Sequence, residues 1–301
     1  MKPTLKPLDE QVVVITGASS GIGLATAEAA AAKGARVVLA ARSVHALREI
    51  AERINASGGE AVAVECDVAD RADVERVAQA AIERFGRIDT WVNNAGVSIY
   101  GRLEEAGEAD SRRVFDTNFW GVYNGSLAAL PHLRASGGAL INVGSEVSEA
   151  IVPLQGIYSA SKHAVKGFTD ALRVEVEEID GAPVAITLIQ PTATDTPFPQ
   201  HARNYMDREP KLPDPMIEPE RVAEAILHAA THHTRDKRVG AMSKINTATA
   251  KIAPGLGDKM AAKQADRQQL DEPAHDREGA LYRPSEATRV VAQTHGARWR
   301  S

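Results

Sequence analysis

Short apolar runs alternate with longer amphipathic segments along the first 190 residues of the chain. The apolar runs are rich in Val, Ile, Leu and Ala, which is typical of strands buried on both faces of a sheet. Most of the segments between them contain strong helix formers and end at glycine. The pattern predicts strands over residues 12–15, 35–41, 60–65, 88–92, 137–143 and 183–190, with helices over 24–33, 44–55, 70–85, 110–133 and 155–180. Strands that alternate with helices through short connections predict an α/β fold, a doubly wound parallel sheet with helices on both faces.

The pattern changes beyond Pro191, because seven prolines fall between Pro191 and Pro219. So many prolines exclude a long helix or a central strand. After the sixth strand this segment would cross the cleft at the sheet edge. Residues 190–219 are therefore expected to form either a substrate lid or a rigid connector.

The remaining chain completes one domain and adds an extension. A helix is predicted over 220–232, and a short seventh strand over 238–242. We therefore expect a single domain over residues 8–245. Residues 246–301 are polar with few apolar anchors, which favours a C-terminal extension that is part helix and part loosely held tail.

Charge and cysteine content exclude several function classes. A net charge of −5 and a pI near 6.0 provide no basic field for nucleic acid. The single cysteine, Cys66, permits no internal disulfide and suits a reducing compartment, where it is expected to be a buried structural thiol. No apolar signal segment or membrane-spanning run is present, so we expect a cytoplasmic protein without a membrane partner. His228 and His232, with Glu224 one turn earlier, have metal-ligand spacing, but no cysteines or further acids gather there in the sequence. We favour a solvated helix end and predict no metal site.

A glycine turn joins the first predicted strand to the first helix. Its sequence is Thr16-Gly17-x-x-x-Gly21-x-Gly23. Glycines at a helix N-terminus expose backbone N–H groups and let a pyrophosphate approach closely. The alternative is a plain connector. We favour nucleotide binding.

The second predicted strand ends at Ala41 and Arg42, where a dinucleotide fold contacts the adenosine ribose. An acidic residue there would repel a 2′-phosphate, whereas a neutral residue followed by a guanidinium suits it. This favours NADP(H), with NAD(H) as the alternative. The other interpretation of Arg42 is an ordinary solvated side chain.

Tyr158 and Lys162 are four residues apart and share one face of a predicted helix. A nearby ammonium lowers a phenol pKa, which prepares tyrosine for proton exchange with an alcohol or ketone oxygen. Ser145, at the end of the fifth strand, is placed to donate a hydrogen bond to the same oxygen. Glu146 and Glu149 lie beside this serine. A solvated loop is the favoured interpretation for both acids, with contact to a polar substrate as the alternative.

These motifs occur together with Asn93-Asn94-Ala95-Gly96 and Asn118, in one order and at characteristic separations. Over about residues 10 to 200 the chain closely resembles the short-chain dehydrogenase/reductase family. The resemblance implies one Rossmann-type domain that binds NAD(H) or NADP(H). It also implies reversible hydride transfer with a small carbonyl or secondary alcohol substrate, in a homodimer or homotetramer built through the helices around Asn118 and Lys162. The alternative is a catalytically silent dinucleotide sensor on the same fold, which the intact catalytic motif disfavours.

The resemblance also implies residue roles. Tyr158 would be the acid/base, Lys162 would lower its pKa and hold the nicotinamide ribose, Ser145 would position the substrate oxygen, and Asn118 would support a proton-relay water. The cofactor-binding residues would be Gly17, Ser19, Ser20, Gly21, Ile22, Gly23, Arg42, Asp67, Val68, Asn94, Ala95, Gly96, Tyr158, Lys162, Pro191 and Thr196. Ser148 is a rival to Ser145, ranked lower because of its separation from Tyr158. The chain departs from the family after the sixth strand, where Pro191-Thr192 replaces the usual Pro-Gly.

Overall fold

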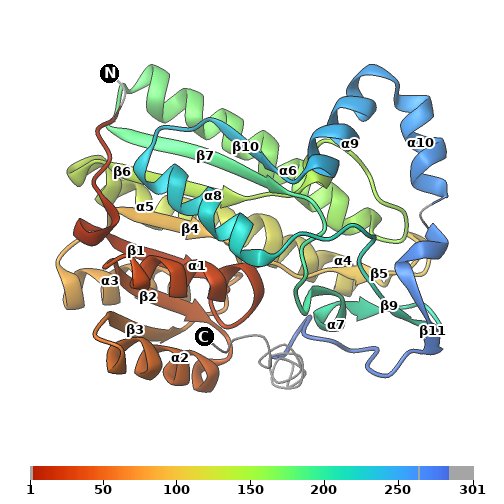
Figure 1. The fold of residues 1–301 in the computed structure, drawn as a ribbon, viewed down its shortest axis with the longest axis horizontal. Coiled ribbons are helices and arrows are strands. Elements are labelled where there is room, and N and C mark those ends of the chain that lie inside the picture. The colour runs from red at the N-terminus through yellow and green to blue at the C-terminus, as the bar shows by residue number, and fades with distance from the viewer. Residues whose placement is uncertain (1–2, 264, 285–301) are drawn as a thin grey trace.

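The computed structural model describes residues 3–263 and 265–284. Its centre is a seven-stranded sheet in the order β3-β2-β1-β4-β6-β7-β10, and every neighbouring pair is parallel (Figure 1). The strands are β1 Val12–Thr16, β2 Arg36–Ala41, β3 Glu60–Glu65, β4 Thr90–Asn93, β6 Gly138–Val143, β7 Val184–Pro191 and β10 Asp236–Val239. The predicted fold class is confirmed. The strand order reverses between β1 and β4, which is where ligands bind in doubly wound sheets.

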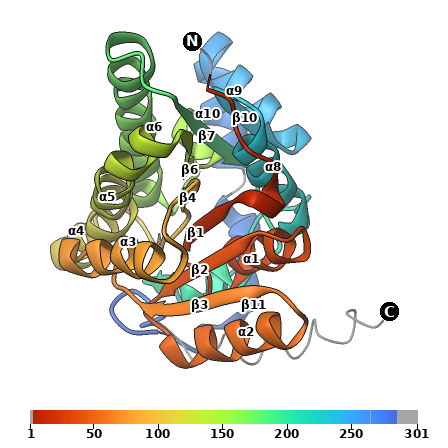
Figure 2. The ribbon, with the colours of Figure 1, turned by 90° about the vertical axis from the view of Figure 1, so that its left-hand side faces the viewer.

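Helices cover both faces of this sheet, as the edge-on view in Figure 2 shows. One face carries α1 Gly21–Ala32, α2 Val44–Ala56 and α8 Pro219–Thr231, and the other carries α3 Arg71–Phe85, α5 Gly121–Ser136 and α6 Gly156–Arg173. Each face has its own apolar core cluster, since alternate side chains of the strands point to opposite sides. The buried sheet therefore places the strand ends on a rigid base.

Local signals set several helix ends as predicted. The Asp70 carboxylate accepts a hydrogen bond from Ala72 N and caps the start of α3. Gly86 ends α3 with a φ of 77°, a left-handed conformation that suits glycine. Cys66 is buried beside α3, and burial raises the pKa of its thiol to about 12, in agreement with the predicted structural role.

The predicted single helix over 110–133 is interrupted. The structure has α4 Glu108–Phe115, a π-helical turn over Asp116–Trp120 and then α5. Asn118 lies in this turn. Two glycines of α5, Gly121 and Gly125, follow it at positions where the helix packs closely on other segments. A Cβ on Gly121 would lie 2.5 Å from Val68 Cγ2, and a Cβ on Gly125 would lie 2.0 Å from Asn93 Oδ1. The wider turn thus turns Asn118 inward while α5 packs tightly on the strand ends.

The long helix predicted over 155–180 is also not α-helical throughout. α6 ends at Arg173, and a second π-helical segment, Val174–Ile179, continues it. The last strand, β10, ends three residues before the predicted boundary because Gly240 adopts a φ of 96° there.

Two pairs of short strands hold the proline-rich segment, one against the loop after β4 and the other against the C-terminal extension. The first pair joins β5 Ile99–Tyr100 to β8 Arg203–Asn204, and the second joins β9 Arg208–Pro210 to β11 Gln269–Pro273. α7 Phe198–His201 lies just before β8, and α9 Ala241–Ile252 and α10 Pro254–Ala262 form a helical pair at one end of the molecule (Figure 1).

Residues 276–282, named the strap here, run back across the domain. Leu281 is fully buried against Val97, Ile99 and Val114. The backbone of Ala280 donates to His201 O, so the strap also follows α7. This part of the extension is packed, which differs from the predicted loose tail. The rest of that predicted tail, 285–301, lies outside the described residues.

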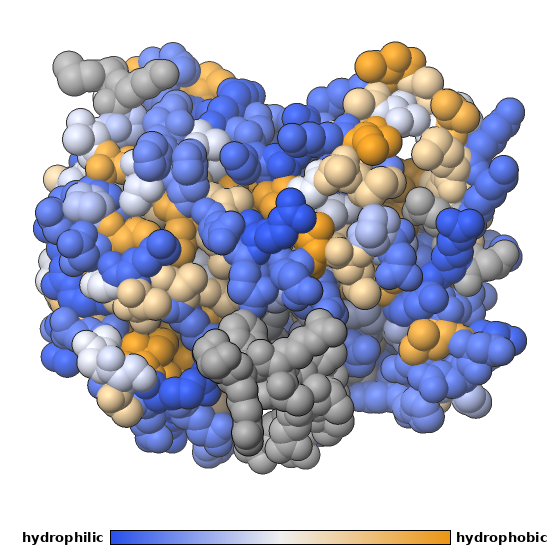
Figure 3. Space-filling view, in the orientation of Figure 1, coloured by the Kyte–Doolittle hydropathy of each residue, from blue (hydrophilic) through white to orange (hydrophobic). Residues whose placement is uncertain are grey.

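The surface leaves some apolar side chains uncovered. Figure 3 shows them gathered over α9 and α10, where Ile252 and Leu256 are 84% and 57% exposed. Within the described residues, no helix combines the length and hydrophobicity needed to cross a bilayer.

Candidate active site

A cavity of about 260 Å³ opens at the carboxyl ends of the strands, next to the β1–β4 switch point. The cavity is lined by every site residue predicted from the sequence except Gly23 and Asn118. These two lie directly behind the wall. The topology therefore gathers into one cleft residues that are spread over almost 180 positions of the sequence.

The glycine turn forms one end of this cleft. Gly17 has a φ of +67°, and a Cβ there would lie 2.8 Å from Ala95 Cα. Gly23 packs beneath it, where a Cβ would lie 2.2 Å from Gly17 O. Asn94 ties the turn to the next strand, because its Nδ2 donates to Thr16 O at 2.9 Å. The turn therefore has no room for side chains at its two closest contacts.

The first turn of α1 faces the same cavity. Ser20, its N-cap, makes no side-chain capping hydrogen bond. Backbone N–H groups in the first turn of a helix have no partner within that helix. Together with the positive end of the helix dipole they form a ready site for an anion such as phosphate.

Arg42, which follows β2, also lines the cleft and contacts the strap. Its Nη1 donates to Leu281 O at 3.1 Å and its Nη2 to Ala280 O at 2.5 Å. Burial lowers the pKa of this guanidinium; the charge of Asp67 opposes that shift and the charge of Arg113 adds to it. Asp67, the acid beside it, is paired with Arg113 at 2.5 Å. Among the described residues Arg42 has no salt-bridge partner, so this end of the cleft carries excess positive charge.

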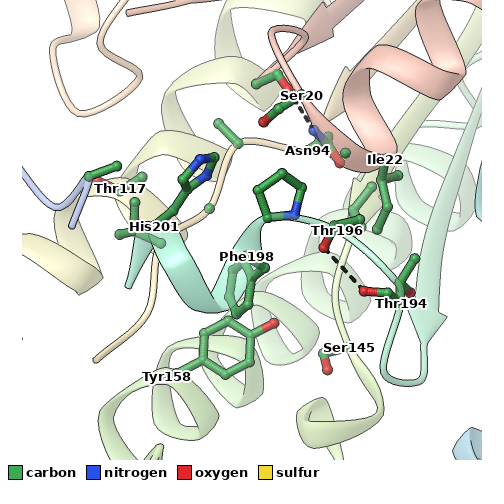
Figure 4. Close-up of a pocket in the computed structure, with 18 of the residues that line it drawn as sticks. Ser20, Ile22, Asn94, Thr117, Ser145, Tyr158, Thr194, Thr196, Phe198 and His201 are labelled. Carbon is green, nitrogen blue, oxygen red and sulfur yellow. Dashed lines mark hydrogen bonds between the residues drawn. The ribbon is translucent and has the colours of Figure 1, made fainter. Parts of the chain in front are cut away.

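Two residues beside Arg42 were not foreseen from the sequence. Burial, with a smaller contribution from Arg42, lowers the pKa of His201 to about 4, so its ring is neutral at pH 7. Its Nε2 and the Thr117 hydroxyl have no hydrogen-bond partner among the described residues. Both line the cleft and lie at the same end of it in Figure 4. No periodic pattern distinguishes them, since α7 and the π-helical turn arise from tertiary packing.

The opposite end of the cleft holds Tyr158, Ser145 and Lys162. The Tyr158 hydroxyl points toward the side of the pocket on which Ser145 lies (Figure 4). Burial raises the pKa of Tyr158 to about 12, a hydrogen bond with Ser145 lowers it, and the Glu146 charge raises it. Burial lowers the pKa of Lys162 to about 8.

The predicted lowering of the Tyr158 pKa by Lys162 is therefore not found in this structure. The Lys162 Nζ donates to Val143 O at 2.8 Å and lies 5.8 Å from the centre of the Tyr158 ring. The ammonium is directed to the backbone of β6 and to the ring face, and desolvation dominates both pKa values.

Asn118 supports the wall of the cleft from behind. Its Nδ2 donates to Val97 O at 2.9 Å and to Ser161 Oγ at 3.0 Å, and its Oδ1 accepts from Val97 N at 2.8 Å. It thus links the loop after β4 to α6, the helix that carries Tyr158 and Lys162.

The serine ranking agrees with the geometry. Ser145 lines the cleft, whereas Ser148 is buried outside it and its hydroxyl accepts from Ser145 N at 3.1 Å.

The proline-rich segment forms the outer wall. The Phe198 ring lies 5.3 Å from the Tyr158 ring, centre to centre, and covers it in Figure 4. Thr196 lines the pocket as predicted, with its hydroxyl donating to Thr194 O at 3.1 Å. Glu146 also faces this cavity and is half-buried, so its interpretation as a solvated loop residue is wrong. Thr192 and Asn246 lie against its carboxylate.

Residues 11–207 match the family model described as short chain dehydrogenase. The chain belongs to the short-chain dehydrogenase/reductase family. The oxidoreductase YxnA of Bacillus subtilis is 46% identical over 286 residues, which cover 93% of this chain and 80% of YxnA. The 11-beta-hydroxysteroid dehydrogenase A of Sesamum indicum is 42% identical over 183 residues, 60% of this chain and 51% of that protein.

Solved members of the family have the same fold. An alcohol dehydrogenase of the archaeon Thermococcus sibiricus, complexed with 5-hydroxy-NADP, superposes with a TM-score of 0.67 at 31% identity, covering 76% of this chain and 94% of its own. A short-chain dehydrogenase/reductase of Burkholderia phymatum in complex with NAD gives a TM-score of 0.71 at 27% identity, covering 90% and 100%. This chain is accordingly an oxidoreductase of the family, acting on CH–OH or C=O groups.

Proposed function

We propose that this protein transfers a hydride reversibly between NADP(H) and a small carbonyl or secondary alcohol compound, with Tyr158 as the general acid and base. One observation carries the proposal. The Tyr158 and Ser145 hydroxyls and the Lys162 ammonium converge at one end of a cleft, and an uncapped helix N-terminus and a glycine turn form its other end. NAD(H) is the alternative cofactor.

The chain's own groups fit a dinucleotide. The N–H groups of the first turn of α1 suit a pyrophosphate, and the absence of Cβ atoms at Gly17 and Gly23 lets it approach. Asn94, Ala95 and Gly96 follow β4 and would line the adenosine ribose. Pro191 and Thr196 lie near the catalytic end, where the nicotinamide would be held. The related structures bound to 5-hydroxy-NADP and to NAD support this assignment.

The preference for NADP(H) rests on Arg42. Ala41 contributes no acid at this position, and the carboxylate of Asp67 is already paired with Arg113. Among the described residues the half-buried Arg42 guanidinium has no salt-bridge partner, so it would gain a strong, bidentate interaction from a 2′-phosphate. The strap carbonyls of Ala280 and Leu281 occupy only two of its five N–H groups, and they hold the group at the rim of the cleft.

The catalytic steps follow from the protonation states. When bound, the nicotinamide supplies or accepts the hydride. Tyr158 keeps its proton at neutral pH, so it donates that proton to the carbonyl oxygen during reduction and recovers it during oxidation. Ser145 donates a hydrogen bond to the same oxygen and orients it. Lys162 lines the same end of the cleft and would hold the nicotinamide ribose. Phe198 covers Tyr158 and excludes water from the exchange.

We also propose that residues 190–219 act as a substrate lid on the domain formed by residues 8–245. Phe198, Leu212 and Pro213 of this segment line the cleft, and Phe198 lies against Tyr158, which supports a lid over a connector. The family resemblance further suggests a homodimer or homotetramer.

The cofactor proposal is tested by steady-state kinetics with NADPH and NADH against a panel of aldehydes, ketones and ketosteroids. For Arg42→Gln we expect KM for NADPH to rise at least about tenfold while KM for NADH changes little, since only the 2′-phosphate contact is lost. Arg48→Gln, an exposed arginine of α2 outside the cleft, is the matched control. A wild-type preference for NADH would contradict the proposal.

A further inference from the structure

The carboxylate of Glu146 lies at the reaction end of the cleft with Tyr158 and Ser145. It is half-buried, and burial raises its pKa. Among the described residues no cation forms a salt bridge with it. Glu149, three residues later, is surrounded by cations. Arg238, Lys251 and Lys166 form salt bridges with its carboxylate at 2.8, 2.9 and 3.7 Å. The chain therefore neutralises the acid outside the cleft and leaves the one inside it without a counter-charge.

Two neutral side chains hold the Glu146 carboxylate in place. Thr192 Oγ1 donates to its Oε2 at 3.1 Å, and Asn246 Nδ2 donates to the same atom at 3.0 Å. Thr192 stands where the family usually has glycine, and Asn246 belongs to α9 in the C-terminal extension. Within the described part of the chain, Oε1 receives no hydrogen bond.

The segments that supply these two donors are themselves fixed. Thr192 N donates to Val239 O at 3.0 Å, and Ser243 Oγ, near the start of α9, donates to Gln190 O at 2.9 Å. The carboxylate is thus oriented by β7, β10 and α9 together. Such support is expected for a group that recognises a ligand.

The surroundings of Glu146 define the ligand group. Apolar side chains also line the cleft, among them Val147, Val152 and Phe198, and the Phe198 ring lies against Tyr158. The other acid of the cleft, Asp67, is paired with Arg113 at the opposite end. An unpaired, partly desolvated carboxylate is costly in the absence of a counter-charge, so a cationic hydrogen-bond donor on the ligand would be bound strongly.

We propose that Glu146 selects the substrate, and that the substrate is a ketone or secondary alcohol that also carries a protonated amine. This inference rests on the hydride transfer proposed above. The amine takes no part in the reaction. Its N–H donates to Glu146 Oε1, while the reacting oxygen lies between Tyr158 and Ser145.

The test compares two ketones of nearly the same shape with NADPH as reductant. One is 3-dimethylamino-1-phenylpropan-1-one, which carries a protonated amine, and the other is its neutral carbon analogue, 4-methyl-1-phenylpentan-1-one. We expect wild-type kcat/KM to be at least about tenfold higher for the aminoketone, since a charge-assisted hydrogen bond distinguishes the two. In Glu146→Gln this ratio should fall to near one, because only the aminoketone loses its charge-assisted hydrogen bond. Glu149→Gln, the same substitution outside the cleft, should leave the ratio unchanged.

The outcomes separate this inference from the proposed function. If the panel ketones are reduced in a Tyr158-dependent manner but the wild-type ratio is near one, or if Glu146→Gln leaves the ratio unchanged, the inference is overturned and the proposed function stands. If neither test ketone turns over, calorimetry compares the binding of both to the NADP⁺-saturated protein, and equal affinity overturns the inference. If no carbonyl compound of the panel is reduced at all, the proposed function itself fails.

Discussion

Burial decides the chemistry of the individual active-site residues. The sequence places Tyr158 and Lys162 on one helical face, which predicts a phenol pKa lowered by the ammonium. In the folded protein both side chains are desolvated, which raises the pKa of Tyr158 to about 12 and lowers that of Lys162 to about 8. The phenol therefore keeps its proton at neutral pH, and Lys162 is a charged group held in an unfavourable environment.

The Lys162 shift predicts how stability depends on pH. Below pH 8 the ammonium is charged in both states, so the folded protein bears the full desolvation penalty. Between pH 8 and about 10.5 the folded state releases this proton first, and the penalty is relieved as pH rises. We expect Lys162→Met to raise the free energy of unfolding at pH 7 by about 1–3 kcal/mol, and this gain to shrink at pH 9.5.

Urea denaturation at the two pH values measures this difference. Lys33→Met, at the exposed end of α1, is the control and should change stability little at either pH. The prediction is contradicted if Lys162→Met is less stable than the wild type at pH 7, or if its gain in the free energy of unfolding grows with pH. Either result would show that burial of the ammonium does not destabilise the fold.

Sequence motifs located most of the site residues but not their surroundings. Ser145, Tyr158 and Lys162 could be found because their spacing and order are characteristic. The state of Glu146 could not, since it depends on Thr192 and on Asn246, 100 residues away in the chain. Likewise, Arg42 could be predicted as a cofactor contact, but the strap carbonyls that hold it could not.

At the scale of the elements, close packing on β4 explains the broken helix around Asn118. A Cβ on Gly125 would lie 2.0 Å from Asn93 Oδ1 and 2.8 Å from Trp91 Nε1. Asn93 belongs to a buried network, in which its Nδ2 donates to Asn142 Oδ1 at 2.9 Å. Because both neighbours are held by hydrogen bonds, the site has little freedom to adjust.

We therefore expect Gly125→Ala to lower the free energy of unfolding by about 1–3 kcal/mol, although alanine is the better helix former. Gly167→Ala is the matched control, because it lies inside α6 and its Cβ would meet no atom within 4 Å. That substitution should raise the free energy of unfolding by about 0.5–1 kcal/mol. Thermal unfolding of the two variants checks the contrast, and a Gly125→Ala variant as stable as Gly167→Ala would contradict it.

Elements with strong periodicity were predictable, and elements made by long-range contacts were not. The alternating run at 60–65 is a strand with the predicted ends, and Asp70 and Gly86 mark the ends of α3. The short pairs β5–β8 and β9–β11 have only two to five residues in each strand and no apolar pattern. The strap is fixed mainly by Leu281, a single apolar anchor that no local rule identifies.

At the scale of the whole molecule, we propose that an aromatic cluster on the π-helical turn and the start of α5 is a surface for assembly. Trp120 is 47% exposed, and its ring packs against Phe119 and Tyr123 at centroid distances of 5.1 and 5.4 Å. Exposed aromatic clusters are enriched at interfaces.

We expect light scattering after size exclusion to give twice or four times the chain mass, and Trp120→Glu to shift it toward the single chain. Leu256→Glu, on the exposed apolar face of α10, is the control and should leave the assembly intact. Dissociation by Leu256→Glu alone would place the interface at the C-terminal helices instead.

Proton transfer by Tyr158 is tested by replacing this residue with phenylalanine. NADPH oxidation by a reactive ketone from the panel is compared between the wild type and Tyr158→Phe, with NADPH affinity measured for both by fluorescence. We predict a loss of kcat of about 10²–10⁴-fold in the variant, because the acid is gone, with NADPH affinity changed less than about threefold. A variant that retains wild-type turnover would contradict the mechanism.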